Sequence, residues 1–402
     1  MGRNEIILSS FIFLVFLSGC AQQEVEIPPS VPEEIVEEAT AIPEESPPMK
    51  GEANNLTDIT PQQQDVTVNQ PAVQETKDQE TKVQEPKCSR EFSQQFKAEP
   101  YYSGPLFDAH FHMPPAWEEL EAGYTLPVLG KDITLPQILC YFDKEKVTGA
   151  ITFNFWEYEN LEQSIQDVAE MKKQLPTGIH LFLIPSELLA EELDEIVTSY
   201  QGVFDGFGEI SHYSPERSGQ TPDDPASLEM YKVVAKHGLI IMFHPGKNQR
   251  SKVENALQKN PDVKFLLHGP EAEDYITDLI EQYPNVYYSI DTILIRLPNP
   301  TRPSGPLMYM VSGKEEYKLK FTQNFDAMLN YAVNKWKNRI EQHPDRFMWG
   351  TDRAADWHFN EEISILVEEF ARAFTERLDP AVQEKFAYKN AERLIEMSGE
   401  NE

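Results

Sequence analysis

The sequence predicts an α/β fold, a (β/α)8 TIM barrel that follows a signal peptide and a disordered acidic tether. Eight short apolar runs succeed one another between residues 101 and 402, and segments with helical spacing separate them. Near-continuous apolar strands that alternate with helices are typical of a parallel sheet covered on both faces. Eight such units favour a closed barrel. The alternative is an open doubly wound sheet, but no Gly-x-Gly-x-x-Gly turn follows the first run.

Residues 1–19 are typical of a lipoprotein signal peptide. Arg3 is the only positive charge before the apolar stretch 6–17, which is too short to span a bilayer. The stretch runs into Leu17-Ser-Gly-Cys20, which resembles a bacterial lipobox. The resemblance implies cleavage before Cys20, lipidation of Cys20 and anchoring at the extracytoplasmic face of the cell membrane by several acyl chains. The alternative is an ordinary cleaved signal that contains a cysteine.

Residues 20–100 form the predicted tether. Residues 21–87 contain no Phe, Trp or Tyr, nine prolines, and 15 acidic residues against four lysines, a net charge of −11. Such a segment cannot bury enough apolar surface to offset the entropy of ordering. We therefore expect disorder here.

The chain is strongly acidic, and the two cysteines after Cys20 leave one question open. The net charge is −32, of which residues 88–402 carry −21. No basic footprint is available to neutralise phosphates, so nucleic acid is excluded as a partner.

Cys88 and Cys140 could pair in an oxidising compartment. Cys140 lies in an apolar helical pattern, however, which favours a buried thiol.

The barrel is predicted from residue 101 to residue 402. In order, the apolar runs are 106–113, 149–156, 180–185, 204–210, 239–245, 263–269, 286–292 and 346–352. Helical spacing occurs at 225–237, 252–260, 271–283, 321–343 and 360–375. The segment 297–320 holds four prolines and no clear pattern, so we expect a loop over the barrel mouth. Asp379 and Pro380 predict an N-cap and first turn for a closing helix.

Polar side chains of metal-ligand type end five of these runs. Because the carboxyl ends of barrel strands open onto one face, we expect these side chains to converge. The two histidines in His-x-His at a strand end point the same way and can share one divalent metal. The alternative is a pair of edge histidines without a metal. The six residues are His110, His112, Glu209, His244, His268 and Asp352.

Residues 106–397 resemble the amidohydrolase superfamily, in particular its amidohydrolase-related branch of hydrolases and decarboxylases. The resemblance implies a divalent metal, often zinc, bound by His110, His112, His244 and Asp352. It implies that His268 either holds a second metal or contacts substrate. The motifs that carry it are Asp108-Ala-His-Phe-His112, His244-Pro-Gly246, His268-Gly269, Gly350-Thr-Asp352 and Tyr388-Lys-Asn-Ala-Glu-Arg-Leu394.

Glu209 leaves the number of metal ions open at one or two. Some superfamily members place a Lys or Glu at the end of the fourth strand, where it bridges two metals. The superfamily's metal-dependent nucleases use a glutamate ligand there, but the acidic charge of this chain disfavours a nuclease. The alternative for Glu209 is a residue that is hydrogen-bonded at the barrel mouth.

The predicted activity is hydrolysis of a C–O or C–N bond in a small ester, lactone or amide. A divalent metal lowers the pKa of bound water from about 15.7 towards 7. The resemblance implies that Asp352 takes the proton of that water and passes it to the leaving group, and that His268 polarises the scissile carbonyl. One alternative is a non-oxidative metal-dependent decarboxylase of an aromatic or unsaturated acid. A second is a non-catalytic solute-binding lipoprotein, which the intact ligand set disfavours.

Three further residues are candidates for substrate binding. Arg353 follows Asp352 and could bind a substrate anion, with a salt bridge as the alternative. His212 could line the pocket or only pack, and Arg250 could clamp a carboxylate. Trp117 and Trp357 could form the pocket floor, although buried aromatics more often serve packing. The structural histidines are expected to be His180, His237 and His343.

Overall fold

The computed structural model describes residues 100–112, 135–154, 161–184, 189–213, 220–297, 305–353 and 356–398. The predicted signal peptide and the tether up to residue 99, with Cys20 and Cys88, lie outside these ranges, as does Trp117. Within the described ranges, no helix combines the length and the apolar character that crossing a bilayer requires.

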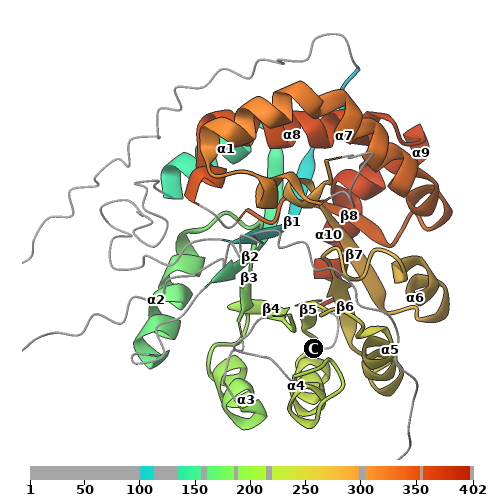
Figure 1. Cartoon of the computed structure of the whole chain (residues 1–402). Helices are drawn as coiled ribbons and strands as arrows, with labels where there is room; N and C mark the ends of the chain where they lie inside the picture. The colour runs from blue at the N-terminus through green and yellow to red at the C-terminus, as the bar shows by residue number, and fades with distance from the viewer. Residues whose placement is uncertain are drawn as a thin grey trace, which may run out of the picture. The chain divides into compact units, whose positions relative to one another are not determined.

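Eight parallel strands form the centre of the described domain, in the order in which they occur along the chain (Figure 1). Each strand overlaps one of the eight predicted apolar runs, so the predicted (β/α)8 TIM barrel is confirmed. The strands are β1 (Leu106–His112), β2 (Val147–Asn154), β3 (Ile179–Leu183), β4 (Phe204–Ser211), β5 (Ile240–His244), β6 (Lys264–Leu267), β7 (Val286–Asp291) and β8 (Phe347–Gly350).

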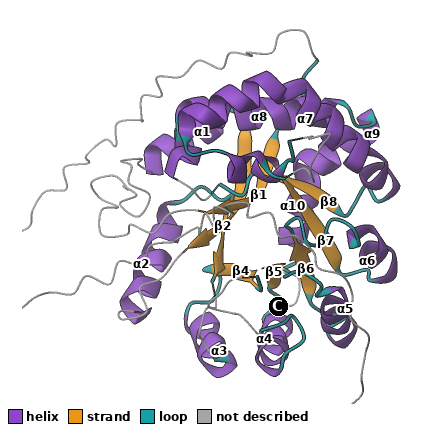
Figure 2. Ribbon diagram, in the orientation of Figure 1, coloured by secondary structure: helices purple, strands orange, loops and turns teal. Residues whose placement is uncertain are grey.

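Helices surround the strands on the outside, purple around orange in Figure 2. Residues on both faces of the strands are buried, which explains why the runs are apolar throughout and do not alternate. The helices are α1 (Leu135–Lys144), α2 (Leu161–Gln174), α3 (Ala190–Ser199), α4 (Pro225–Lys236), α5 (Arg250–Lys259), α6 (Ile276–Gln282), α7 (Lys314–Gln342), α8 (Glu361–Glu376), α9 (Pro380–Glu384) and α10 (Asn390–Glu396).

The segment predicted as a long loop is partly helical. A short 3₁₀ turn covers Leu307–Met310, and α7 begins at Lys314, before the expected start. Residues 298–304 lie outside the described ranges. The closing segment begins as predicted, because the Asp379 side chain accepts a hydrogen bond from Ala381 N at 2.8 Å. A π-helical turn, Lys385–Lys389, joins α9 to α10.

The barrel closes between β1 and β8 through a few individual hydrogen bonds. The Asp108 carboxylate accepts hydrogen bonds from Thr351 N at 2.9 Å and Thr351 Oγ1 at 2.6 Å. Asp352 N donates to His110 O at 2.8 Å, and His112 N donates to Arg353 O at 3.3 Å. The residues that follow β8 therefore bind along the end of β1. This closure places Asp352 beside the two histidines of β1.

Cys140 on α1 is buried and disulfide-bonded. The prediction of a buried free thiol is therefore wrong, because an apolar helical pattern indicates burial and carries no information about the partner of the sulfur. The chain has three cysteines, and the other two lie outside the described residues.

Three histidines lie beside carboxylates and away from the carboxyl ends of the strands, as expected for structural residues. His180 Nδ1 lies 3.1 Å from Asp205, and His237 Nε2 lies 2.6 Å from Asp194. His343 Nε2 lies 3.5 Å from Glu281.

Candidate active site

The structure brings the six strand-end residues together in one cluster. His110 and His112 are among the last three residues of β1, Glu209 lies near the end of β4, and His244 ends β5. His268 directly follows β6, and Asp352 follows β8 by two residues. Their side chains are buried, with exposures from 0% for His110 to 15% for Asp352. The convergence expected from the barrel topology is therefore present.

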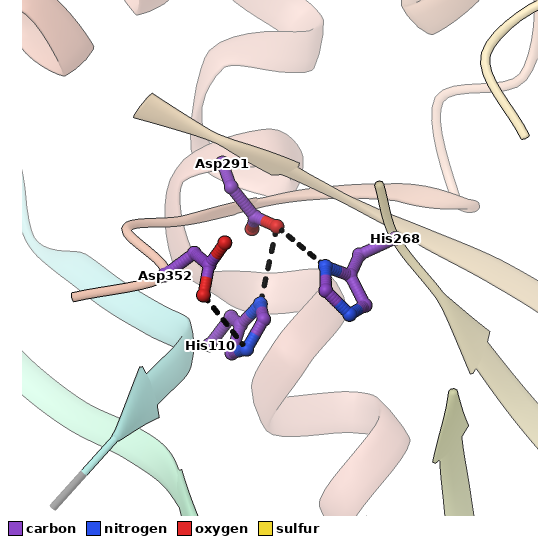
Figure 3. A group of neighbouring side chains, drawn as sticks. All are labelled: His110, His268, Asp291 and Asp352. Carbon is purple, nitrogen blue, oxygen red and sulfur yellow. Dashed lines mark hydrogen bonds and ion pairs between the residues drawn. The ribbon is translucent and has the colours of Figure 1, made fainter. Parts of the chain in front are cut away.

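A first group of four donor atoms has the dimensions of a tetrahedral metal site. The Nε2 atoms of His110 and His112 lie 3.0 Å apart. Asp352 Oδ1 lies 3.4 and 3.3 Å from them, and Glu209 Oε2 lies 3.7 and 3.4 Å from them. Figure 3 shows His110 and Asp352 in this arrangement. Donor atoms that bind a tetrahedral zinc ion at 2.0–2.1 Å are separated by about 3.3–3.4 Å. The separations given above, 3.0 to 3.7 Å, bracket this value, so the four residues suit one ion.

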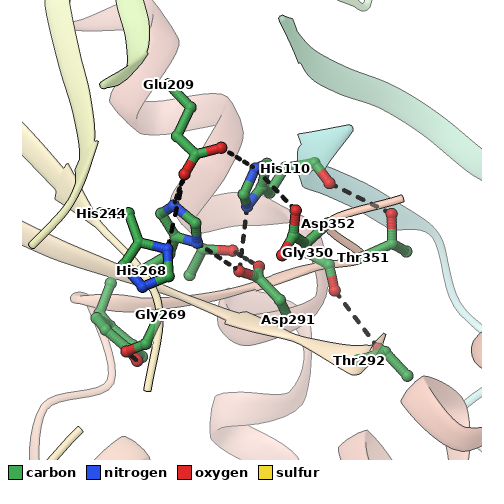
Figure 4. Close-up of polar contacts among 12 residues, drawn as sticks. His110, Glu209, His244, His268, Gly269, Asp291, Thr292, Gly350, Thr351 and Asp352 are labelled. Atoms are coloured by element: carbon green, nitrogen blue, oxygen red, sulfur yellow. Dashed lines mark hydrogen bonds and ion pairs between the residues drawn. The ribbon is translucent and has the colours of Figure 1, made fainter. Parts of the chain in front are cut away.

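A second group of donors lies on the other oxygen of Glu209. Glu209 Oε1 lies 2.9 Å from His268 Nε2 and 3.6 Å from His244 Nδ1 (Figure 4). These three ligand atoms lie within 4.8 Å of one another. The two oxygens of one carboxylate thus face two separate groups of imidazoles, which is the arrangement of a bridging ligand.

His244 belongs to a different group from the one that the resemblance implies. It was expected to share a metal with His110, His112 and Asp352, whereas its Nδ1 faces Glu209 Oε1 and His268. The reason is local: His244 Nε2 lies 2.7 Å from Glu271 Oε2, which turns the other ring nitrogen towards Glu209. Glu209 takes the fourth position of the first group.

Two carboxylates outside the predicted set contact the histidines on the ring nitrogens that face away from the two donor groups. Asp291 Oδ2 lies 3.1 Å from both His110 Nδ1 and His268 Nδ1. Glu271 contacts His244 as described above. Asp291 ends the seventh strand and carries the same strand-end signal as the six predicted residues, so sequence reasoning could have found it. Glu271 lies between β6 and α6, at the start of the segment 271–283 with helical spacing, and this spacing does not mark it as a contact of a histidine.

Opposing charges shift the pKa values in the cluster. Burial lowers the pKa of the His110 imidazole, but Asp352 and Asp291 together outweigh burial and raise this pKa to about 10. The same competition between burial and neighbouring carboxylates raises the pKa of His112 and His268 to about 9. Burial raises the pKa of Glu209, yet the surrounding histidines hold it well below the usual value. Without a cation, the cluster therefore holds protons that a divalent ion would replace.

Backbone geometry supports the crowded cluster at two positions. Gly269 has φ +90°, and a Cβ there would lie 2.2 Å from His244 Nε2, so only glycine leaves room for the ring. Asp352 adopts φ +56°, a left-handed conformation that Asp tolerates better than most residues. Such conformations gather at functional sites.

The predicted substrate-binding residues are not all at the cluster. Arg353 is 2% exposed and donates to Glu368 Oε1 and Ser364 Oγ, both at 2.7 Å, which matches the salt-bridge alternative. Arg250 on α5 faces outward and pairs with Glu254 and Asp278, both at 2.9 Å, so the structure does not bring it to the cluster.

His212 lies next to the cluster and is buried. Its ring packs edge-on against Phe243 with centroids 5.5 Å apart, and its backbone N donates to His244 O at 3.0 Å. The neighbouring Tyr213 is 52% exposed, and its ring centroid lies 4.2 Å from that of His244. The Tyr213 ring is therefore both exposed to solvent and packed against the imidazole of His244, which belongs to the second donor group.

The chain resembles several solved structures with low sequence identity. An uncharacterized TIM-barrel protein from Bordetella bronchiseptica is 17% identical, with a TM-score of 0.46 over 73% of this chain and 99% of the other. An amidohydrolase from Burkholderia multivorans with bound zinc is 15% identical, with a TM-score of 0.45 over 73% and 99%. The 2,6-dihydroxybenzoate decarboxylase from Rhizobium is 17% identical, with a TM-score of 0.42 over 74% and 100%.

No curated protein matches the chain. The family model described as amidohydrolase matches residues 107–396, which span the whole barrel and all six strand-end residues. The chain therefore belongs to the amidohydrolase family of enzymes.

Proposed function

We propose that this enzyme is a metal-dependent hydrolase with two metal positions that share Glu209. The observation that carries the proposal is the placement of the two Glu209 oxygens. Oε2 belongs to a group of four donors with the spacing of a tetrahedral site, and Oε1 faces the imidazoles of His244 and His268. Imidazole and carboxylate are donors that suit zinc and other divalent transition metals. The residues present therefore fit the cofactor that is typical of the family.

Bound there, divalent ions supply Lewis acidity and lower the pKa of water towards 7. The chain contributes the proton transfer. Asp352 has the most exposed side chain of the six, 15% against 9% or less for the others. It is therefore the group that water or substrate can approach. We assign to Asp352 the role of general base for the attacking water and general acid for the leaving group.

His268 takes a role different from the one expected from the sequence. It is 1% exposed, and both ring nitrogens are engaged, Nδ1 with Asp291 and Nε2 with Glu209. A side chain in this position holds the centre together and does not polarise a substrate carbonyl. We therefore assign His268 to the second donor group.

Small esters, lactones or amides are the substrates proposed, with hydrolysis favoured over decarboxylation. A decarboxylase must hold the carboxylate of its substrate, and a cation near the centre would assist. The two arginines considered for that role are committed elsewhere, Arg353 to Glu368 and Arg250 to Glu254 and Asp278. The carboxylate of Asp352, 15% exposed, lies beside the two histidines of β1 instead, which suits the activation of water.

The test combines metal content with the fate of water. The purified full chain is expected to carry close to two equivalents of a divalent metal and to hydrolyse members of an ester, lactone and amide panel with uptake of ¹⁸O from labelled water. Less than half an equivalent of metal, after purification without chelator, would contradict the proposal. Release of carbon dioxide from an aromatic acid without ¹⁸O uptake would support the decarboxylase in its place.

We also propose that the enzyme is a lipoprotein, anchored through Cys20 at the extracytoplasmic face of the cell membrane. The lipobox-like sequence and the acidic tether motivate this proposal. The disulfide at Cys140 supports it, since such bonds persist in oxidising compartments outside the cytoplasm.

A further inference from the structure

Asp291 joins the two donor groups from behind. Its Oδ2 atom lies 3.1 Å from His110 Nδ1, in the first group, and 3.1 Å from His268 Nδ1, in the second (Figure 3). The two rings stand edge to face, with centroids 4.2 Å apart. The Asp291 side chain is completely buried. One oxygen therefore accepts hydrogen bonds from two imidazoles that belong to different metal positions.

These contacts determine how the rings face. An imidazole that donates through Nδ1 presents Nε2 on its opposite edge, and a carboxylate behind a ligating histidine fixes this orientation. His110 Nε2 accordingly faces His112 and Asp352, and His268 Nε2 faces Glu209. Both rings are aimed by the same atom.

The Asp291 carboxylate has little room to move. Ser289 Oγ donates to its Oδ1 at 2.5 Å. A Cβ at Gly350 would lie 2.5 Å from the same oxygen and 2.4 Å from Ser289 Oγ, so the carboxylate fills the space that the absent side chain leaves. Because the carboxylate is wedged between β7 and β8, any displacement of it would move both imidazoles together.

We propose that Asp291 is a positioning residue that couples the two metal positions, so that its loss lowers the affinity of the chain for both ions. This inference rests on the proposed two-metal function. Glu271 provides the contrast within the same chain. Among the described imidazoles of the cluster, it contacts that of His244, at 2.7 Å, which belongs to the second donor group.

The first experiment titrates zinc into the metal-free full chain against a competing chelator. Wild type is expected to bind two ions. Asp291→Asn, which keeps the shape of the side chain and removes its charge, is expected to lower the zinc affinity of both positions by about 10- to 100-fold. The matched control Glu271→Gln is expected to lower the zinc affinity of one position only. If Asp291→Asn keeps the wild-type circular dichroism and weakens one ion or neither, the proposal is wrong.

A second measurement needs no metal. In protein labelled with ¹⁵N-histidine, the Nδ1–H groups of His110 and His268 are expected to give two slowly exchanging imidazole signals. Asp291→Ala is expected to remove both, Asp291→Asn to retain them because its amide oxygen still accepts, and Glu271→Gln to leave them in place. Loss of one signal or neither in Asp291→Ala would overturn the inference.

The two experiments separate the inference from the proposed function. A wild-type chain that binds no zinc refutes the two-metal function, and with it the coupling of two ions. The imidazole signals then still decide whether Asp291 holds both rings. A wild-type chain that binds two ions, of which Asp291→Asn weakens only one, keeps the function and refutes the coupling.

Discussion

At the residue scale, the division of labour among the carboxylates follows from exposure. Glu209, Asp291 and Asp352 all contact His110, but only Asp352 has more than a tenth of its side chain exposed. A buried carboxylate can orient or bridge, whereas proton transfer needs a group that water can reach. The assignment of Asp352 as acid and base depends on this difference.

Replacing Asp352 with Asn tests that assignment. The amide keeps the shape of the side chain but cannot take a proton, so we expect kcat for hydrolysis to fall by about 10²- to 10⁴-fold. Steady-state kinetics on the best substrate of the panel gives the value. Asp326→Asn, at an exposed position on α7, is the matched control and should retain wild-type kcat. An Asp352→Asn variant with wild-type kcat would exclude Asp352 as the base.

Metal binding is expected to depend on pH with a definite sign. The pKa values of His110, His112 and His268 lie at about 10, 9 and 9 in the metal-free chain, and a ligating imidazole must give up the proton on its donor nitrogen. Zinc affinity should therefore rise as the pH increases from 6 towards 9. Calorimetry in buffers of different ionisation enthalpy should show that zinc binding releases protons at pH 7. Release of no protons would contradict these charge states.

The sequence predicts which residues converge, but not which of the two donor groups each residue joins. Residue type and position at the end of a strand were sufficient to predict that six residues converge: His110, His112, Glu209, His244, His268 and Asp352. The grouping depends on ring orientation, and ring orientation depends on Asp291 and Glu271. Contacts between side chains from different strands leave no trace in the local sequence pattern, so the placement of His244 could not be predicted.

At the element scale, the buried ion pair of Arg353 and Glu368 attaches α8 to the segment that carries Asp352. Both side chains are 3% exposed or less, and Arg353 also donates to Ser364 on the first turn of α8. Removing one member of a buried pair leaves the other charge without compensation. The ion pair therefore stabilises the closure of the barrel beside the active site.

Glu368→Ala should lower the free energy of unfolding by about 3–5 kcal/mol. Glu362→Ala is the matched control on the same helix, because its partner Lys318 and Glu362 itself are 36% and 49% exposed. That exposed pair is expected to contribute about 0.2–1 kcal/mol. Urea denaturation of both variants measures the difference. Equal destabilisation by the two substitutions would contradict the structural role of the Arg353 pair.

The elements themselves were largely predictable, because burial on both faces makes each barrel strand a short apolar run. Capping chemistry also placed the start of the closing helix at Asp379 correctly. The start of α7 was placed too late, since Lys314–Lys320 is charged and follows a proline-rich segment. Pattern alone could not distinguish a solvated helical turn from a loop.

At the scale of the whole molecule, the proposed metal centre and the proposed extracytoplasmic anchor at Cys20 belong to one chain, and they can be tested separately. The prediction is that Cys20→Ala moves the protein from the membrane fraction to the soluble fraction, with its hydrolytic activity unchanged. Fractionation followed by mass spectrometry of the N-terminal peptide checks both location and acylation. A membrane-bound Cys20→Ala protein, or an unmodified Cys20 in the wild type, would contradict the anchor.

We propose that Glu209 would hold two metal ions at the mouth of the barrel, one on each carboxylate oxygen. A crystal structure of the enzyme as purified, with anomalous data collected at transition-metal edges, tests this proposal. We predict two peaks, one bound by His110, His112 and Asp352 and the other by His244 and His268, each with one oxygen of Glu209. A single peak that Glu209 does not contact, or no peak within the cluster, would contradict the claim.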